Sequence, residues 1–313
     1  MYTDEEKTEK EIWQEDIKRA EKEPGKKVYY YMKKHVQYPE KFRNLHDAPD
    51  GIYVQGQLPE VNQPAVAIVG ARMCSNYGKK QAYEFGKYLA QHGAAVISGL
   101  ARGGDGYAHE GALDGGGKTY AILGCGLDHC YPAEHKNLWT RMVEAGGGII
   151  SEFPMCTPPQ PWMFPKRNRL ISALSDLVLV VEAKEKSGSL ITADCALEQG
   201  KTVYAVPGRV GDKLSVGCNR LIFQGAGIAY SPECLLSELH IDNSKEMSKN
   251  EKIKFGLASD LNLVYSCLDF EPQNLDEIVR QTDMSLARVS EILLRLELDG
   301  YVQQAGKNKF VKA

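Results

Sequence analysis

The sequence predicts an α/β protein with a Rossmann-like, doubly wound and mostly parallel sheet, followed by a small C-terminal winged-helix domain. Nearly all of the short apolar runs between residues 66 and 206 lack the alternation of a half-exposed strand, and helical stretches separate them. Continuous apolar strands that alternate with helices are typical of a parallel sheet covered on both faces. Most runs end in glycine or a small polar residue, as strand-to-helix turns at a ligand-binding edge do. The runs are residues 66–69, 95–97, 120–123, 148–150, 177–181 and 203–206.

A charged helical segment is expected ahead of the sheet, at residues 1–37. Its first part is rich in Lys and Glu, and Ile12, Trp13 and Ile17 are spaced for a single helical stripe. Residues 38–54 resemble a loop that leads into an edge strand. We therefore assign residues 38–240 to the Rossmann-like domain.

A polar stretch at residues 241–258 has the composition of a linker, and a winged-helix domain is expected at residues 259–313. One helix begins at Leu275, a second spans residues 285–296 with a serine at its start, and two strand-like runs flank residues 305–308. Two helices followed by a β-hairpin are typical of a winged helix.

The winged-helix region is not basic. Residues 251–313 contain eight Lys or Arg against ten Asp or Glu. A reader of duplex DNA needs a positive face for its phosphate contacts. A protein-interaction or regulatory role therefore stays open beside DNA binding, to which Lys307, Lys309 and Lys312 would contribute.

The overall charge limits the kind of nucleic-acid site that the chain can carry. The 313 residues have a formal net charge of −3, which disfavours a nonspecific electrostatic sleeve and requires any DNA site to be a local basic cluster. No apolar run approaches the roughly 18 residues of a membrane span, and the acidic N-terminus lacks the pattern of a signal peptide. We expect a cytoplasmic protein with no membrane partner.

The eight cysteines do not form a recognisable metal motif, and none pairs as C-x-x-C. Cys125 and Cys130, taken with His129 and His135, have a C-x4-C spacing without a second clustered pair, which does not fit a zinc site. Reduced, buried thiols are the usual state of such residues in a cytosolic protein. We therefore expect neither a metal nor a cofactor.

The first candidate phosphate site is the turn after the run at residues 66–69. Gly70 allows close backbone approach, Arg72 can form a fork on a phosphate, and the following helix, which carries Lys79, directs its positive end towards the turn. The spacing is not G-x-G-x-x-G, so a dinucleotide site is disfavoured. A tight turn with a solvated arginine explains this motif equally well.

A second glycine-rich turn, at residues 98–104, precedes another helix. Asp105 is placed to cap that helix, and His109 lies four residues further on the same face. An acid–base pair is one interpretation. We favour the structural one, in which Asp105 is an N-cap and His109 is a hydrogen-bonded histidine.

The segment at residues 164–169 concentrates the strongest candidate contacts. Cations that reach phosphates, next to a ring on which a base can stack, are typical of single-strand recognition. A helix is expected to start after Pro165. The candidate residues are Phe164, Lys166, Arg167, Asn168 and Arg169.

A further anion-binding turn is expected at Ser187, Gly188 and Ser189, ahead of a helix that reaches Gly200. Similar glycine and serine turns follow the last strong strand. Several such turns at one edge of a sheet indicate an extended anionic ligand rather than a single phosphate.

Together these strings resemble the DNA-processing protein A family (DprA, also called Smf), in order and at the expected spacing over residues 38–235. The resemblance implies a Rossmann-like protein that binds and protects single-stranded DNA, forms homodimers and loads the recombinase RecA onto incoming DNA during natural transformation. No catalytic activity is implied. In this family the Gly-Ser-Arg loop and the Phe-Pro-x-Arg-Asn-Arg segment line the DNA groove. The matching strings include Gly70-Ala71-Arg72, Ser98-Gly99-Leu100-Ala101-Arg102-Gly103, Phe164-Pro165-Lys166-Arg167-Asn168-Arg169 and Ser187-Gly188-Ser189-Leu190-Ile191-Thr192-Ala193.

The chain departs from the family pattern at three places. Ala71 replaces the usual serine, which removes one hydroxyl from the loop. Gly104 stands where isoleucine is common, from which we expect a looser turn. By the same resemblance, we expect the N-terminal helical domain of the family to be shortened here to the charged segment.

Two other functions stay open. One is an enzyme of related fold that cleaves an N-glycosidic bond, with Glu198 as its acid, although the glycine pair of that motif is missing. The other is a site for a small nucleotide, against which the three cations at residues 164–169 favour a polymer.

Overall fold

The computed structural model describes residues 27–241, 259–269 and 272–312. The chain divides into two compact units after Asp242, and each is described by itself. The helical stripe expected around Ile12 and Ile17, and the linker expected at residues 241–258 beyond its first residue, lie outside the described residues.

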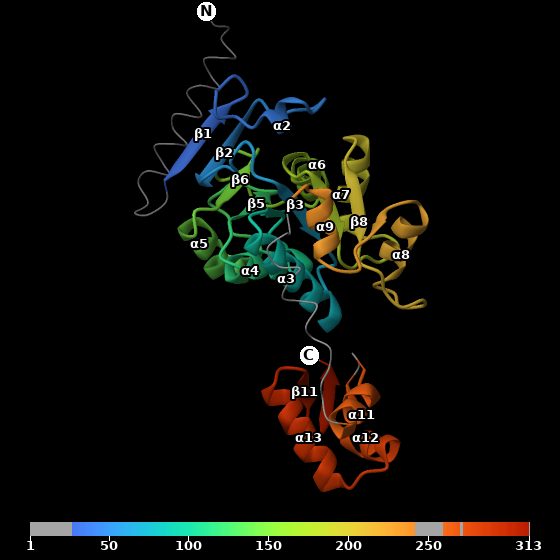
Figure 1. The fold of residues 1–313 in the computed structure, drawn as a ribbon. Helices are drawn as coiled ribbons and strands as arrows, with labels where there is room; N and C mark the ends of the chain where they lie inside the picture. Colours follow the sequence, from blue (N-terminus) through green and yellow to red (C-terminus); the bar gives the residue numbers. More distant parts are fainter. Residues whose placement is uncertain (1–26, 242–258, 270–271, 313) are drawn as a thin grey trace, which may run out of the picture. The chain divides into compact units, whose positions relative to one another are not determined.

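The first unit is built on a nine-stranded sheet in the order β1-β2-β6-β5-β4-β3-β7-β8-β9 (Figure 1). The strands from β6 to β9 in this order are parallel, whereas β1 and β2 run antiparallel. The six apolar runs are all strands, so the expected doubly wound, mostly parallel fold is confirmed. The strands are β1 (Val28–Met32), β2 (Gly51–Gly56), β3 (Ala65–Val69), β4 (Ala95–Ser98), β5 (Thr119–Leu123), β6 (Gly148–Ser151), β7 (Leu177–Val180), β8 (Thr202–Ala205) and β9 (Gly227–Ile228).

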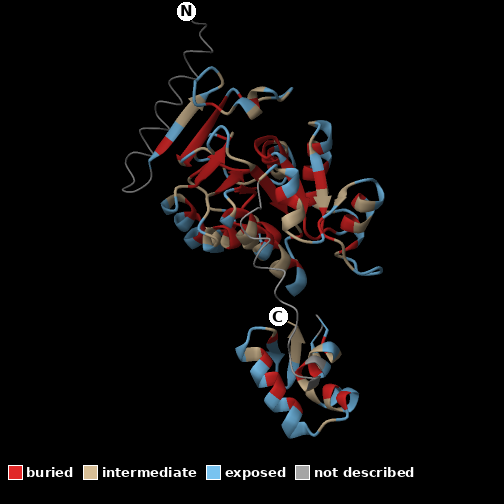
Figure 2. Ribbon diagram, viewed as in Figure 1, coloured by how far each residue is buried: buried red, intermediate tan, exposed pale blue. Residues whose placement is uncertain are grey.

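Helices cover both faces of this sheet, and its strands from β2 to β7 are almost entirely buried (Figure 2). One face packs against α3 (Asn76–Gln91), α4 (Gly104–Asp114), α5 (Lys136–Glu144) and α9 (Glu233–Glu238). The other packs against α2 (Glu40–Arg43), α6 (Met163–Leu174), α7 (Gly188–Glu198) and α8 (Val216–Phe223). This two-sided cover explains why the strands lack an alternating pattern.

The edge of the sheet differs from the expectation. Residues 28–32 were expected within the charged helical segment, but they form β1, which pairs with β2 and makes β2 an inner strand. The Val-Tyr-Tyr-Tyr-Met sequence of β1 is β-branched and aromatic, which suits a half-buried pleated surface. The helical interpretation was therefore wrong for these five residues, because the Lys and Glu before them dominated the composition.

The direction of winding reverses at β3. The chain proceeds from β3 to β4, β5 and β6 on one side, and then crosses back through α6 to place β7 on the other side of β3. The loop after β3 leads to α3 on one face, whereas the loop after β7 leads to α7 on the opposite face. In open α/β sheets, ligands bind at the carboxyl ends of the strands at such a switch point.

The second unit is a small helical domain with a three-stranded sheet. The expected helices and the hairpin are present, α12 has an Asn274–Glu277 capping box, and Ser285 caps α13. The first helix, α11, was not expected. The elements are α11 (Ser259–Cys267), β10 (Gln273–Asn274), α12 (Leu275–Thr282), α13 (Leu286–Leu298), β11 (Val302–Gly306) and β12 (Lys309–Lys312). Among the helices of the described residues, none has the length and apolar character needed to span a membrane.

Candidate nucleic-acid interface

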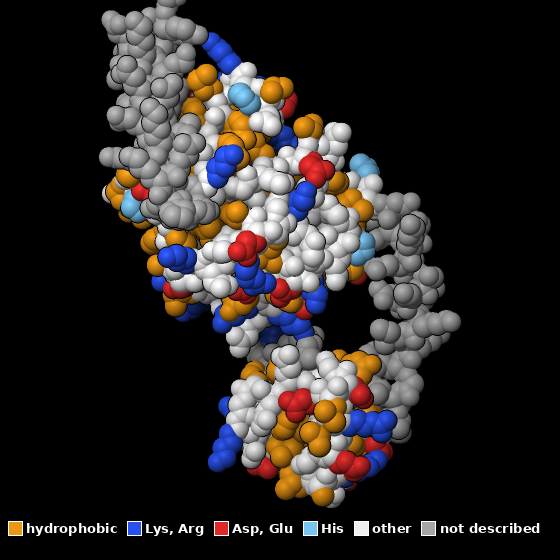
Figure 3. Space-filling model, turned by 90° about the vertical axis from the view of Figure 1, so that its left-hand side faces the viewer, with side chains coloured by type: hydrophobic (Ala, Val, Ile, Leu, Met, Phe, Trp, Pro, Cys, Tyr) orange, Lys and Arg blue, Asp and Glu red, His pale blue; other side chains and the backbone are white. Residues whose placement is uncertain are grey.

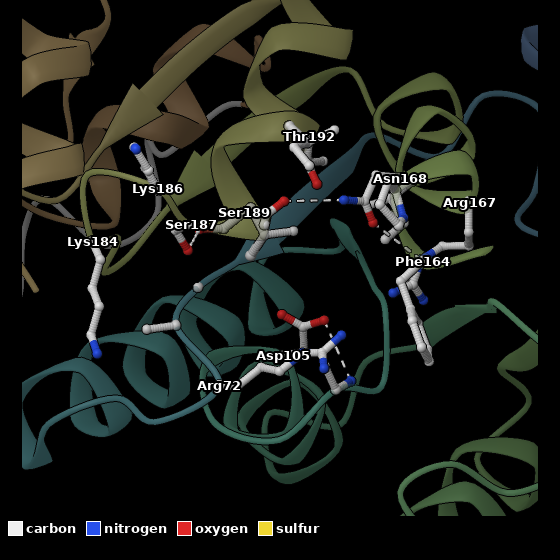
Figure 4. Close-up of a pocket in the computed structure, with 18 of the residues that line it drawn as sticks. Arg72, Asp105, Phe164, Arg167, Asn168, Lys184, Lys186, Ser187, Ser189 and Thr192 are labelled. Carbon is white, nitrogen blue, oxygen red and sulfur yellow. Dashed lines mark hydrogen bonds between the residues drawn. The ribbon is translucent and has the colours of Figure 1, made fainter. Parts of the chain in front are cut away.

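A pocket of about 560 Å³ opens at the carboxyl ends of β3 and β7, where the winding reverses. Its walls are the loop after β3, the loop between β7 and α7, and the first turns of α6 (Figure 4). This volume falls in the range of sites for small organic ligands or single nucleotides. We call it the switch-point pocket.

One wall of the switch-point pocket is a face of α6. Phe164, Arg167, Asn168 and Ile171 line it, at the i, i+3, i+4, i+7 spacing of one helical face. The helix begins at Met163, so the expectation that it starts after Pro165 was wrong. Pro165 is tolerated because the first turn of a helix has no intrahelical acceptors for its N–H groups.

Arg167 lies in the floor of the pocket rather than at its mouth. The residue is 4% exposed, and its Nη1 donates to the carbonyl oxygens of Gly99, at 2.8 Å, and Ile122. Burial lowers the pKa of Arg167 to about 10, although the charge of Asp105 opposes this shift. With these bonds Arg167 fastens α6 to the loop after β4 and to β5.

Asp105 belongs to the same buried network. Its Oδ2 accepts from the backbone N–H groups of Gly99, at 3.1 Å, and Ala101, at 3.4 Å, and burial raises its pKa. The expectation that Asp105 caps α4 was wrong, because Gly103 is the N-cap and Asp105 lies inside the first turn. His109 is a buried, hydrogen-bonded histidine, as expected, with Nδ1 2.6 Å from Thr119 Oγ1.

The loop after β3 brings an exposed arginine to the pocket. The guanidinium carbon of Arg72 lies 5.0 Å from the centroid of the Phe164 ring, which also lies 5.4 Å from the ring of Tyr131. In such an arrangement the guanidinium can bind a phosphate while a base stacks on one of the two rings. We call these three residues the inner aromatic group.

Two glycines allow this loop to lie against the start of α4. A Cβ on Gly104 would lie 2.9 Å from the Cα of Gly70, closer than side chains tolerate. The expectation that Gly104 loosens the turn was therefore wrong, since its missing side chain permits a tight contact. Ala71 is buried and its carbonyl oxygen accepts from Gly104 N at 3.2 Å.

The N-terminus of α3 is closed to a ligand. Ser75 caps the helix by accepting from Gly78 N at 3.1 Å. The buried carboxylate of Glu182, from the segment after β7, accepts from Ser75 N at 2.8 Å and from Ser75 Oγ at 2.5 Å. Gly78 leaves the space that this carboxylate occupies. At this helix N-terminus the structure favours the ordinary-turn interpretation, because a carboxylate of the protein itself lies there, whereas Arg72 of the same motif lines the pocket.

The N-terminus of α7 differs from that of α3. Ser187, at the N-cap, makes no capping hydrogen bond, and its hydroxyl lies 2.8 Å from that of Ser189. Both serines and Gly188 line the switch-point pocket, as does the buried Thr192 one turn further along the helix. The first N–H groups of a helix and its dipole attract anions, so this end is suited to a phosphate.

Two exposed lysines flank the N-terminus of α7. Lys184 and Lys186 line the pocket from the loop between β7 and α7, and Figure 4 shows them across the pocket from Phe164 and Arg167. Asn168 links the two walls, because its Nδ2 donates to the carbonyl oxygen of Gly188 at 3.1 Å. The pocket therefore combines cations on one wall with a ring on the other.

The structure brings together most of the expected site residues but not all. Lys166 and Arg169 lie on α6 outside the lining of the pocket, and Arg169 forms ion pairs with Asp47, at 2.5 Å, and Glu152, at 2.7 Å. Lys79 also lies outside the lining, with its Nζ 5.8 Å from the centroid of the Tyr107 ring. The residues that line the pocket as expected are Gly70, Arg72, Phe164, Arg167, Asn168, Ser187, Gly188 and Ser189.

Among the polar and aromatic residues of the pocket, four were missed from the sequence. Lys184 and Lys186 directly precede the expected turn at Ser187. Their position next to a predicted anion-binding turn could have identified them as phosphate contacts. Thr192 follows one turn into the same helix. Tyr131 gave no local signal, because only the fold brings its loop to α6.

The described residues offer little for the alternative chemistries. Glu198 is the last residue of α7 and lies at the opposite end of that helix from the pocket. Among residues 27–241, 259–269 and 272–312, no group of three or more His, Cys, Asp or Glu side chains is arranged to hold a metal ion.

The face of the second unit seen in Figure 3 is mixed rather than basic. Hydrophobic side chains gather on one face among residues of both charges (Figure 3). Leu286, Leu294 and Leu298 of α13 are exposed, and Arg288 pairs with Asp260 and Glu291. This surface does not resemble the positive face of a duplex reader.

Comparison with known proteins gives consistent results for both units. The profile of the DNA recombination-mediator protein A family matches residues 29–240, and that of the DprA winged helix domain matches residues 250–306. The chain is 38% identical over 270 residues to Protein Smf of Escherichia coli K12, across 85% of this chain and 72% of that protein. It is 40% identical over 204 residues to the DNA processing protein DprA of Bacillus subtilis, across 65% of this chain and 68% of that protein.

Two solved structures resemble this chain over 68% of its length. The crystal structure of DNA processing protein A from Streptococcus pneumoniae superimposes with a TM-score of 0.63 at 38% identity, covering 68% of this chain and 74% of that one. The Helicobacter pylori DNA processing protein A, described for its single-stranded DNA binding mode, gives a TM-score of 0.61 at 31% identity, covering 68% of this chain and 95% of that one.

Proposed function

Because this chain belongs to the DNA recombination-mediator protein A family of DNA-processing proteins, we propose that it binds single-stranded DNA in the switch-point pocket. The observation that carries the proposal is the composition of the two pocket walls. Exposed cations and an uncapped helix N-terminus face an aromatic ring across a space that fits a nucleotide. The Helicobacter pylori relative, which is described as binding single-stranded DNA, supports the same ligand.

We assign the contacts according to the chemistry of each side chain. Arg72, Lys184 and Lys186 bind backbone phosphates, together with the hydroxyl groups and N–H groups at the start of α7. Phe164 and Tyr131 receive a base by stacking. Arg167 and Asn168 hold the walls together rather than contacting the strand, since their polar groups are engaged within the protein.

In the cell, we propose, the protein protects incoming single strands during natural transformation and loads RecA onto them, acting in the cytoplasm as a homodimer and without catalysis. The family resemblance supports this role, and the pocket supports its DNA-binding step. RecA loading is tested by measuring RecA filament formation on an oligonucleotide coated with single-strand-binding protein. The protein should accelerate it, and an Arg72→Glu variant should not.

The binding step is tested by fluorescence anisotropy with a labelled oligothymidylate over a range of salt concentrations. Affinity should fall steeply with salt, and Arg72→Glu should weaken binding by about tenfold or more, since it reverses a phosphate contact. Lys87→Glu, near the far end of α3, is the matched control and should bind as the parent does. Equal affinity for Arg72→Glu and the parent contradicts the assignment.

A competition experiment distinguishes a polymer site from a nucleotide site. Thymidine monophosphate should displace the oligonucleotide only at concentrations far above those of unlabelled oligothymidylate, because it fills one subsite of several. Equal potency of the mononucleotide would instead favour a small-ligand site.

A further inference from the structure

The start of α6 carries a second aromatic group outside the switch-point pocket. Trp162, the N-cap of α6, packs edge-on against Phe153, with ring centroids 5.9 Å apart and planes inclined at 83°. The ammonium of Lys166 lies 5.5 Å from the centroid of the same Phe153 ring. We call these three residues the outer aromatic group.

Trp162 is unusually accessible for its residue type. Its surface is 58% exposed, whereas Phe153, against which it packs, is buried. A large apolar ring that is held in place and left open to solvent is suited to receive a flat partner. Tryptophan offers the largest surface of any side chain for stacking on a base.

The outer aromatic group is adjacent to the pocket in the sequence. Pro161 and Phe164 both line the pocket, and Trp162 lies between them in the chain. The inner aromatic group pairs Phe164 with the cation of Arg72, and the outer one pairs Phe153 and Trp162 with the cation of Lys166. A strand that leaves the pocket past Phe164 therefore meets a second ring and a second cation.

We propose that Trp162 and Lys166 form a nucleotide subsite outside the pocket, in which the indole stacks on a base and the ammonium contacts a phosphate. The proposal rests on the proposed function, because it extends the same bound strand. It also gives a role to Lys166, which the fold places outside the pocket.

The charges around Lys166 indicate which interaction dominates. Glu152 Oε2 lies 3.7 Å from Lys166 Nζ but 2.7 Å from Arg169 Nη2, and Arg169 also pairs with Asp47. The side chain of Glu152 is 4% exposed, whereas that of Lys166 is 47% exposed. The two cations, Lys166 and Arg169, are balanced by the carboxylates of Glu152 and Asp47. Stacking on Trp162 should therefore contribute more to binding than charge does. Removing the Trp162 ring should alter the salt dependence of binding little.

The chain has three tryptophans, Trp13, Trp139 and Trp162, of which Trp139 is buried. A base that stacks on Trp162 should quench its fluorescence. We expect a 12-residue oligothymidylate to quench the parent and to quench Trp162→Phe much less, because that variant keeps a stacking ring but lacks the exposed indole. Equal quenching of both proteins would overturn the subsite.

Affinity measurements use two oligonucleotide lengths. Trp162→Ala should bind the 12-residue oligothymidylate about tenfold more weakly than the parent, since one stacked base is lost. It should bind a two-residue oligothymidylate, which is held mainly by the pocket, as the parent does. Trp162→Phe should stay within about twofold of the parent for both lengths.

The outcomes separate this inference from the proposed function. If the parent binds both lengths and Trp162→Ala binds the longer one equally well, the subsite is overturned and the pocket stands. If the parent binds neither length, both proposals are overturned. Unchanged melting temperatures for the Trp162 variants, which alter an exposed side chain, exclude unfolding as the cause of weaker binding.

Discussion

The N-termini of α3 and α7 lie at the same switch point and arise from similar sequences, yet they meet anions in opposite ways. Both follow a buried strand and a turn that contains a serine. At α3, Ser75 caps the helix and the carboxylate of Glu182 binds that serine. At α7, Ser187 makes no capping bond, and Lys184 and Lys186 flank the helix start.

The difference is in which helix N-terminus is met by the protein's own side chains: Ser75 and Glu182 meet that of α3, and no side chain caps that of α7. In a dinucleotide-binding Rossmann fold the first helix receives the pyrophosphate. Here Glu182 places a carboxylate of the chain itself at that helix, and the function proposed above puts the phosphate across the crevice at α7. The same carboxylate ties the β3 loop, which carries Arg72, to the segment that carries Lys184.

The largest expected effect on DNA binding is at the N-terminus of α7. Reversing both charges, with Lys184→Glu and Lys186→Glu together, should weaken oligothymidylate binding at low salt at least 100-fold, or by about 3 kcal/mol. The slope of log affinity against log salt should flatten by about 0.7 for each phosphate that the protein no longer neutralises. Fluorescence anisotropy over a range of salt concentrations measures both quantities.

The matched control keeps the same type of change at a distance from the pocket. Lys87→Glu in an otherwise unchanged chain should retain both the affinity and the salt slope of the parent. If the double variant behaves like this control, α7 does not provide the phosphate site and the contrast with α3 fails.

The second effect, on stability and on the response to phosphate, is at the N-terminus of α3. Glu182→Ala removes the acceptor of two hydrogen bonds from Ser75 and should lower the free energy of unfolding by about 2 kcal/mol. It also vacates the N-terminus of α3, so inorganic phosphate should now raise the melting temperature of the variant more than that of the parent. Thermal unfolding with phosphate and with chloride at equal ionic strength measures this difference.

Glu182→Gln is the control for shape, since it nearly fills the same space without the charge. It should be less destabilised than Glu182→Ala and should gain less from phosphate. A Glu182→Ala variant that responds to phosphate no more than the parent would show that Glu182 does not occupy an anion site.

Much of the fold followed from local patterns. The six apolar runs predicted the parallel strands because burial on both faces leaves no polar positions. The site was less accessible to such reasoning. The contacts between Ser75 and Glu182 join residues that are 107 positions apart in the sequence. Nothing in the sequence near either residue predicts the other as its partner. The helix N-terminus next to the Gly70–Arg72 turn therefore already holds a carboxylate of the protein.

The segment at residues 164–169 shows a different kind of error. Its composition correctly attracted attention, but Pro165 suggested a turn before the helix, and all the cations were assigned to one site. Because α6 already begins at Met163, helical geometry turns Phe164 and Arg167 towards the pocket, while Lys166 and Arg169 lie outside it. The phase of a helix determines which of several adjacent charges can share a ligand.

The smallest effect compares the two serines directly. Ser75→Ala removes a helix cap and should lower the free energy of unfolding by about 1 kcal/mol. Ser187→Ala removes a hydroxyl that caps nothing, so stability should change by only a few tenths of a kcal/mol. For DNA affinity the order of the two variants should reverse, and Ser187→Ala should have the larger effect. Ser187 lines the pocket, whereas Ser75 is bound to Glu182. We expect Ser187→Ala to weaken oligothymidylate binding about threefold, as the loss of one modest hydrogen bond does. Urea unfolding and anisotropy on the same two variants measure both orders, and a Ser187→Ala variant that loses stability but no affinity would show that α7 is capped like α3.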